Sequence, residues 1–148
     1  MQLSYQVIVN KPIQVVWDYA NDPETLAHWL NDFVSYQQVS GIDDAPGVGD
    51  SAKVTYTQPG GEFTMLERVT EYDAPRHIKL LMTSKYFDME IVNDYLEVEP
   101  NKTQLTASAD FVRIGLMMRV IFFFSSKRKM LTDHERQINK LKELVEAT

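Results

Sequence analysis

The sequence contains no cysteine, which excludes disulfide bonds, thiolate-bound metals and a cysteine nucleophile. Positive charge is also scarce, since 15 Lys and Arg against 21 Asp and Glu give a net charge of −6. An acidic chain repels phosphate backbones, and the basic run 127–129 is too short to line a groove, so we expect no nucleic-acid partner. The three histidines, His28, His77 and His134, lie far apart in the sequence, and we predict neither a metal site nor another cofactor.

Long apolar runs are absent as well. The N-terminal residues 1–10 alternate in polarity and lack the apolar stretch of a signal peptide, and no segment is long enough to cross a bilayer. We therefore expect a cytoplasmic protein without stable membrane insertion. The 148 residues, 44% hydrophobic and 24% charged, fit one domain over residues 1–148.

Alternation of apolar and polar residues is the main pattern that is present. It predicts a first strand over 3–9 with one buried face. From residue 33 onwards the same period recurs between turn signals such as 43–47 and 59–61, which is typical of antiparallel strands joined by short turns. The six further candidate strands cover 33–40, 51–58, 62–72, 77–84, 87–98 and 103–112.

Two short helices are expected between the first two strands. Pro12 and Pro23 suit the first turn of a helix, and Asp22 suits the N-cap of the second. Trp29 belongs to the packed face of that second helix, whereas His28 lies off this face and is expected to contact solvent. His77, at a strand start, is also expected to be exposed.

Apolar residues at heptad-like spacing predict one long helix over 115–147, bent near Ser125-Ser126. Its first half, LMMRVIFFF, is apolar nearly all round. Two interpretations remain open: this half is buried between the sheet and loops, or it is a flexible Met- and Phe-rich cover over an apolar cavity.

The order of these elements resembles the START/Bet v 1-like (SRPBCC) superfamily, specifically its polyketide cyclase/dehydrase and lipid-transport group. The matching stretches, which together span essentially the whole chain, are VNKPIQVVWDYANDPETLAHWL, PGVGD, ERVTEYDAPRHIKL and LEVEPNKTQLTASADF. The resemblance implies an α+β helix-grip fold. In that fold a curved, antiparallel, seven-stranded sheet wraps around a long C-terminal helix, with an apolar cavity between them.

The first functional hypothesis is a binding protein that encloses a hydrophobic small molecule such as a lipid, isoprenoid or polyketide-like compound. Apolar burial would supply most of the affinity, and one or two polar groups would orient the ligand. Strand and helix faces, together with the resemblance, predict a cavity lined by Trp29, Phe33, Tyr56, Met65, Leu80, Met82, Asp94, Met117, Ile121, Phe124 and His134.

The strand 87–98 has two possible registers, because a slip of one residue exchanges its faces. In one register Asp94 and Glu90 face the cavity, where burial would raise the pKa of a carboxyl and allow it to orient a ligand or transfer a proton. In the other register the inward side chains are Met89, Ile91, Asn93 and Tyr95.

Two other classes of function remain. A cyclase/dehydratase-type enzyme would use a pocket residue among Tyr56, Glu90, Asp94 and His134 for acid–base chemistry on an enolisable substrate. A protein-interaction domain would use the exposed part of LMMRVIFFF to contact a partner or to form a homodimer. The sequence contains no convergent catalytic pair, so binding is preferred and no catalytic residue is assigned.

Overall fold

The structure, a computed structural model, describes residues 1–41, 47–124 and 126–148. The predicted turn at 43–47 and the predicted bend at Ser125 therefore fall largely outside the described residues. The strands are β1 (Gln2–Val9), β2 (Phe33–Ser40), β3 (Ser51–Gln58), β4 (Gly61–Asp73), β5 (His77–Thr83), β6 (Phe87–Glu99) and β7 (Lys102–Ile114). The helices are α1 (Ile13–Asn21), α2 (Leu26–Trp29), α3 (Leu116–Phe124) and α4 (Lys127–Glu146).

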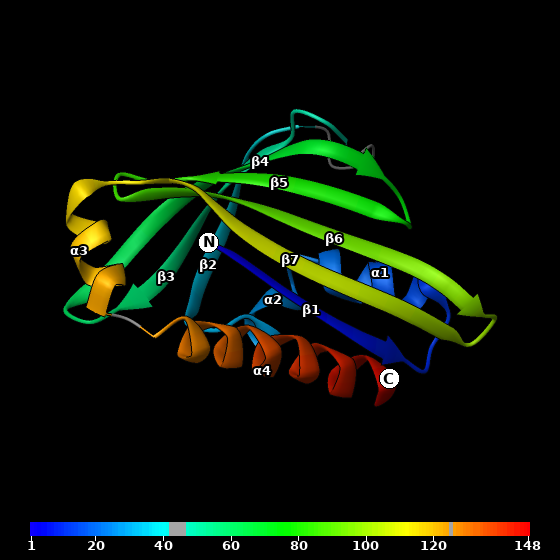
Figure 1. Ribbon diagram of the computed structural model, residues 1–148. Helices are drawn as coiled ribbons and strands as arrows, with labels where there is room; N and C mark the ends of the chain where they lie inside the picture. Colours follow the sequence, from blue (N-terminus) through cyan, green and yellow to red (C-terminus); the bar gives the residue numbers. More distant parts are fainter. Residues whose placement is uncertain (42–46, 125) are drawn as a thin grey trace.

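All seven strands form one antiparallel sheet in the order β1-β7-β6-β5-β4-β3-β2. Successive strands from β2 to β7 are neighbours, as the recurring turn signals predict. β1 instead pairs with β7, Gln2 lying opposite Asp110 and Val9 opposite Thr103. The sheet curves over α4, and α1 and α2 connect its two edge strands (Figure 1). The predicted helix-grip fold is confirmed.

The larger hydrophobic core lies where α4 packs against β1 and its neighbours. Ile138, Leu141 and Val145 have the three- and four-residue spacing of one helix face, and all three are buried. They share a cluster with Val9 of β1 and Trp17 of α1. The C-terminal half of α4 is thus the part that the sheet holds most tightly.

A second, smaller cluster lies on the β3–β5 side of the sheet. It consists of the buried side chains Val54, Met65 and Met82, flanked by partly buried aromatic residues. Ring contacts continue from these aromatics across the sheet to α3, where Phe111 meets Phe122 edge to face with centroids 5.1 Å apart. This contact attaches one face of α3 to the sheet.

The prediction of a single long helix is wrong, because α3 and α4 are separate helices. Ser126 is the N-cap of α4, where its Oγ accepts a hydrogen bond from the Lys129 N–H at 3.3 Å. A serine at an N-cap favours the start of a new helix over the continuation of an old one. The interpretation that LMMRVIFFF is buried is also wrong, since α3 has no fully buried residue. No helix among the described residues is long and apolar enough to span a membrane.

The second short helix begins later than its sequence signals indicate. α2 starts at Leu26 with Thr25 as its N-cap, and Asp22 instead accepts a hydrogen bond from the Glu24 N–H at 2.9 Å in the preceding turn. His28 is exposed, as expected.

Candidate functional site

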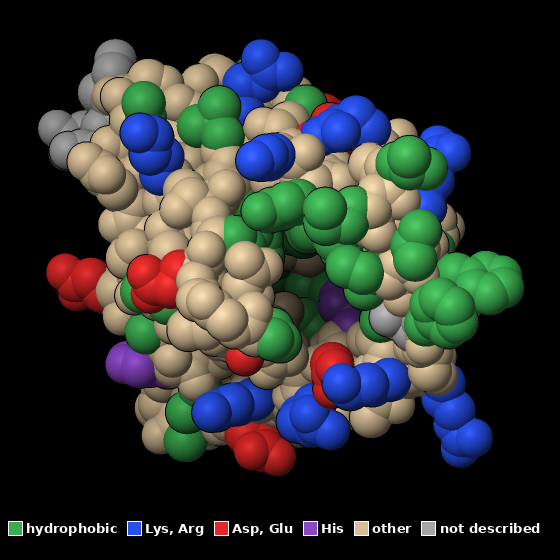
Figure 2. Space-filling model, turned by 90° about the vertical axis from the view of Figure 1, so that its left-hand side faces the viewer, with side chains coloured by type: hydrophobic (Ala, Val, Ile, Leu, Met, Phe, Trp, Pro, Cys, Tyr) green, Lys and Arg blue, Asp and Glu red, His purple; other side chains and the backbone are tan. Residues whose placement is uncertain are grey.

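A pocket of about 960 Å³ lies between the concave face of the sheet, the α1–α2 region and the N-terminal half of α4. Most of its lining is apolar and comes from every strand of the sheet. Figure 2 shows a hollow, surrounded by hydrophobic side chains, at the end of the molecule that carries α3. The pocket is therefore open to a ligand from that end.

Small side chains on the sheet explain why this space is not filled. The inward positions of β7 include Ala107 and Ala109, which are both buried. Opposite them, α4 contributes Met130, His134 and Gln137 in place of the tightly packed residues of its second half. Because alanines do not reach across this gap, the sheet and the helix enclose a hollow instead of a solid core.

Five of the predicted lining residues contact the pocket. They come from four different elements, namely α2, β3, β5 and α4, and they are Trp29, Tyr56, Leu80, Met82 and His134. Met65 and Phe33 do not line the pocket: Met65 is fully buried in the smaller core cluster, and Phe33 packs against that cluster.

The three predicted residues of α3 do not line the pocket either. Met117, Ile121 and Phe124 are 67%, 47% and 81% exposed. The separation of α3 from α4 moves this segment out of the space beneath the sheet. Their placement in the cavity is wrong, because it depended on the single long helix.

The prediction that Asp94 faces the cavity is also wrong. Of the two registers, the structure has the second: Met89, Ile91 and Asn93 line the pocket, and Tyr95 is buried against Trp17 with ring centroids 5.1 Å apart. Burying the large aromatic ring of Tyr95 stabilises the fold more than burying the smaller Leu96 would, and Leu96 is exposed. Alternation then places Asp94 and Glu90 on the outer face.

On the outer face these carboxylates form ion pairs. The His77 ring lies between two carboxylates: its Nδ1 is 2.5 Å from Asp94 Oδ1, and its Nε2 is 3.2 Å from Glu71 Oε1. Lys79 lies 3.5 Å from Glu90 and 3.2 Å from Glu71. His77 is therefore half-buried in a network of charges and not simply exposed, and neither Asp94 nor Glu90 can act inside the pocket.

Six acidic residues line the pocket instead, namely Asp18, Asp22, Asp32, Asp50, Glu67 and Asp133. Glu67 is half-buried on the concave face of the sheet, and the sequence patterns did not single it out. It lies on β4 between Ala52 of β3 and Met82 of β5, two residues after the buried Met65. Within the described residues its carboxyl makes no hydrogen bond or ion pair. Burial raises the pKa of the Glu67 carboxyl to about 7, because protein atoms replace the water that would stabilise its charge. The sequence did contain a signal for Glu67. Met65 was predicted to face the cavity, and residues two positions apart on a strand share a face.

Two tyrosines lie near this carboxyl. Burial, and then the negative charge of Glu67, raise the pKa of Tyr36 to about 12 and also raise that of Tyr56. Both therefore stay protonated near neutral pH and offer O–H donors at the pocket wall. Together, Glu67, Tyr36 and Tyr56 form one polar site within a lining that is mostly, but not entirely, apolar.

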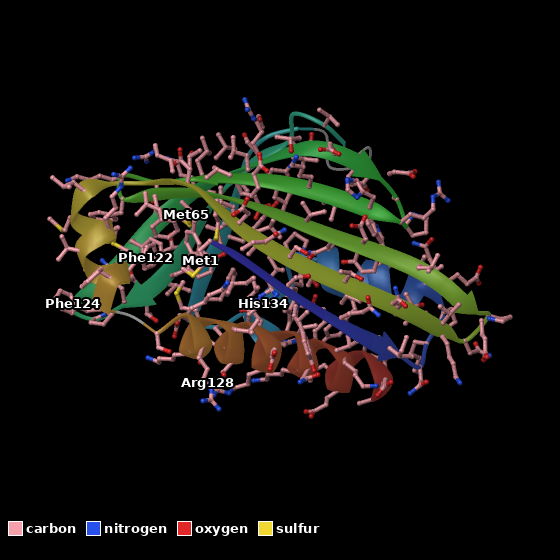
Figure 3. All side chains as sticks on the ribbon, in the orientation of Figure 1. Met1, Met65, Phe122, Phe124, Arg128 and His134 are labelled. Carbon is pink, nitrogen blue, oxygen red and sulfur yellow. The ribbon has the colours of Figure 1, made fainter. Side chains whose placement is uncertain are left out.

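A second polar site lies across the pocket on α4. His134 Nε2 is 2.9 Å from the Ala107 carbonyl, which can only accept, so this nitrogen carries the proton. In the neutral ring, Nδ1 is then an acceptor. Figure 3 shows His134 directed from α4 towards the sheet. Nearby, the Asn31 N–H donates to Gln137 Oε1 at 2.8 Å, which fixes the α2–β2 loop to α4 as one wall of the pocket.

The indole N–H of Trp29 is a further polar group at this wall. Trp29 is buried, and its Nε1 has no hydrogen-bond partner in the described part of the chain. A buried donor without an acceptor is uncommon in folded proteins.

Comparison with known proteins identifies the fold independently. The solved structure of a protein from Thermus thermophilus superposes with a TM-score of 0.76 at 17% identity, covering 99% of this chain and 98% of that one. An aromatase/cyclase from Streptomyces sp. R1128 gives a TM-score of 0.76 at 15% identity, with 99% and 93% covered. A START superfamily protein from Mycobacterium smegmatis gives 0.71 at 14% identity, with 99% and 94% covered.

At such identities the likeness establishes the fold alone. The comparison with curated protein sequences gives no match. The family profile is more specific, because it covers nearly the whole chain: residues 1–146 match the family described as polyketide cyclase / dehydrase and lipid transport. The chain belongs to that family, and with it to the SRPBCC superfamily.

Proposed function

We propose that the protein binds a hydrophobic small molecule, of the lipid, isoprenoid or polyketide-like class, in the pocket between the sheet and α4. The observation that carries this proposal is the pocket itself: about 960 Å³, mostly apolar, with a few polar groups on opposite walls. Small-molecule sites typically have this size and composition. Membership of a family described by polyketide chemistry and lipid transport supports the same ligand class.

The polar groups suggest how such a ligand is oriented. Glu67 with Tyr36 and Tyr56 would hold one polar end, and His134 would contact a second polar group across the pocket. Contacts with Leu80, Ile91 and the other apolar residues would supply the affinity, at roughly 25 cal/mol per Å² of buried apolar surface before ordering costs.

Filling the pocket should abolish binding without unfolding the protein. Nile red, a neutral hydrophobic dye, should bind the wild-type protein with an increase in its fluorescence. Ala109→Trp places a large ring where β7 now leaves space, and we expect it to weaken dye binding at least about tenfold. Leu96→Trp, on the exposed outer face of β6, is the matched control and should bind like the wild type.

Circular dichroism and a thermal melt show whether Ala109→Trp is folded. A wild-type protein that does not bind the dye would contradict the proposal. Equal binding by a folded Ala109→Trp protein would place the dye elsewhere and would contradict it as well.

Glu67 favours a second candidate, an enzyme of the cyclase/dehydratase type. A general acid–base catalyst works best when its pKa is near the operating pH, and Glu67 has this property inside the pocket. It would take the acid–base role for which the sequence suggested four candidates, Tyr56, Glu90, Asp94 and His134, without assigning one. The adjacent tyrosine hydroxyls would donate hydrogen bonds to the oxygen of the resulting enolate.

Exchange of the α-hydrogens of an aromatic 1,3-diketone in D₂O, followed by NMR, tests this second candidate. The wild-type protein should accelerate exchange over buffer, and Glu67→Gln should lose that acceleration while it still binds Nile red. Exchange that is equally fast with Glu67→Gln would exclude Glu67 as the base.

A further inference from the structure

The outer face of α3 is the largest feature that a pocket function leaves unexplained. Five side chains on it are between 55% and 83% exposed: Leu116, Met117, Val120, Phe123 and Phe124. We call these five residues the α3 patch. At about 100° per residue they fall within an arc of about 120° on one side of the helix. The opposite side holds the half-buried Met118 and Phe122, and Phe122 attaches the helix to the sheet through its contact with Phe111.

Phe122 and Phe124 illustrate the two faces. Figure 3 shows Phe122 directed from α3 towards the interior and Phe124 directed away from it. The Phe123 and Phe124 rings contact each other, with centroids 5.3 Å apart. An apolar group of this size at a protein surface usually marks a site of interaction.

Positive charge next to the α3 patch indicates what kind of partner it meets. The basic run Lys127, Arg128 and Lys129 follows α3 closely, is exposed and forms no ion pair within the described residues. Figure 3 shows Arg128 directed away from the sheet, and Figure 2 shows Lys and Arg side chains along the lower edge of the face with the hollow. In a chain of net charge −6 this is a local reversal of sign.

The position of these cations disfavours a purely structural role. They occupy the first turn of α4, which has no acidic residue, and the N-terminus of a helix carries partial positive charge. Three cations at that end oppose the helix dipole. An external anionic surface would relieve this repulsion.

We infer that the α3 patch and the basic run 127–129 together dock on a membrane surface that contains anionic lipids. Aromatic and aliphatic side chains on one helix face, flanked by Lys and Arg, suit insertion at the boundary between lipid headgroups and acyl chains. The basic run contacts the anionic headgroups. Docking in this orientation turns the open end of the pocket towards the bilayer (Figure 2).

Sedimentation with vesicles tests the docking. The wild-type protein should bind vesicles of phosphatidylcholine and phosphatidylserine and bind phosphatidylcholine vesicles much more weakly, with the difference reduced by added salt. Neutralising the basic run in K127Q/R128Q/K129Q should weaken binding to the anionic vesicles roughly hundredfold. The double variant F123S/F124S should weaken it at least about tenfold.

Matched controls carry the same changes elsewhere. K102Q/R136Q/K140Q alters the net charge equally, and Leu96→Ser removes an exposed apolar side chain from the outer face of the sheet. Both should bind like the wild type. A thermal melt confirms that each variant is folded, which is expected because the changed side chains are exposed.

A direct reporter places the helix in the membrane. The native Trp17 and Trp29 are buried, so in Phe124→Trp the change in emission on adding vesicles comes from the new indole. Its emission should shift to the blue with anionic vesicles and be quenched by brominated lipids. Absence of both effects would overturn the proposal.

A second copy of the chain is the competing occupant of the α3 patch. Sedimentation velocity distinguishes dimerisation from membrane docking. Membrane docking would be overturned if the wild-type protein is a dimer that F123S/F124S dissociates and if it does not bind anionic vesicles. Vesicle binding requires no ligand in the pocket, so its failure would leave the proposed binding function intact.

Discussion

Glu67→Gln is expected to make the protein more stable at alkaline pH than the wild type. In the folded protein the pKa of Glu67 is raised to about 7, from 4.5 for an unperturbed glutamate. Between these two values the unfolded chain releases a proton that the folded protein still holds, so the stability of the wild type falls as the pH rises. Above pH 7 the folded protein carries a half-buried charge that has no hydrogen-bond or ion-pair partner among the described residues.

Glutamine has nearly the same shape as glutamate and no charge, so the stability of the variant should not fall in this way as the pH rises. A shift of this size corresponds to about 3 kcal/mol. The gain of Glu67→Gln over the wild type should therefore be about 3 kcal/mol greater at pH 8 than at pH 4, as measured by urea denaturation. Glu62→Gln, the same change at an exposed position of β4, should show no such difference. A gain that does not vary with pH would mean that Glu67 is not desolvated in solution.

Leu141→Ala is expected to cost about 3 kcal/mol of unfolding free energy. Leu141 is 1% exposed and lies at the centre of the α4 face that packs on β1. Removing its side chain leaves a cavity as well as losing apolar burial. Its neighbours cannot collapse easily, because α4 is also fixed by Lys142, whose Nζ donates to the Ile8 carbonyl at 2.7 Å, and by Glu146, which accepts from the Asn10 N–H at 2.7 Å.

Urea denaturation measures this cost, with Leu96→Ala as the control. Leu96 is 56% exposed, so the identical truncation there should change stability by less than about 0.5 kcal/mol. Equal effects at the two positions would show that the C-terminal half of α4 is not held against the sheet as described.

The strands were predictable because their signal is local. Alternation in residues such as Leu105, Ala107 and Ala109, ended by turn residues, reproduces every strand to within about two residues, which is the usual uncertainty of such boundaries. The register of β6 was not predictable in the same way. There a contact between Tyr95 and Trp17, distant in the sequence, decides which face is buried.

The site was less predictable than the fold for the same reason. Glu67 has a raised pKa because β3 and β5 place Ala52 and Met82 beside it. Strand pairing of this kind cannot be predicted from the sequence around Glu67. The sequence predicted a bend near Ser125-Ser126 and not a complete break, because apolar spacing continues across this point and only the capping serine marks the start of α4. Long-range packing, and not the local sequence pattern, therefore determines which polar residues line the pocket.

The pairing of β1 with β7 also constrains how the protein is made. Ser4 and Ser108, which hydrogen-bond across this pair, are 104 residues apart in the chain. On the ribosome, β1 emerges first but has no partner until β7 has been synthesised, and α4, which covers it, follows later still. Closing so large a loop is entropically costly and slows folding. The nascent chain thus exposes Val7 and Val9 for most of its synthesis, and that interval is when this protein is most open to chaperones and to aggregation.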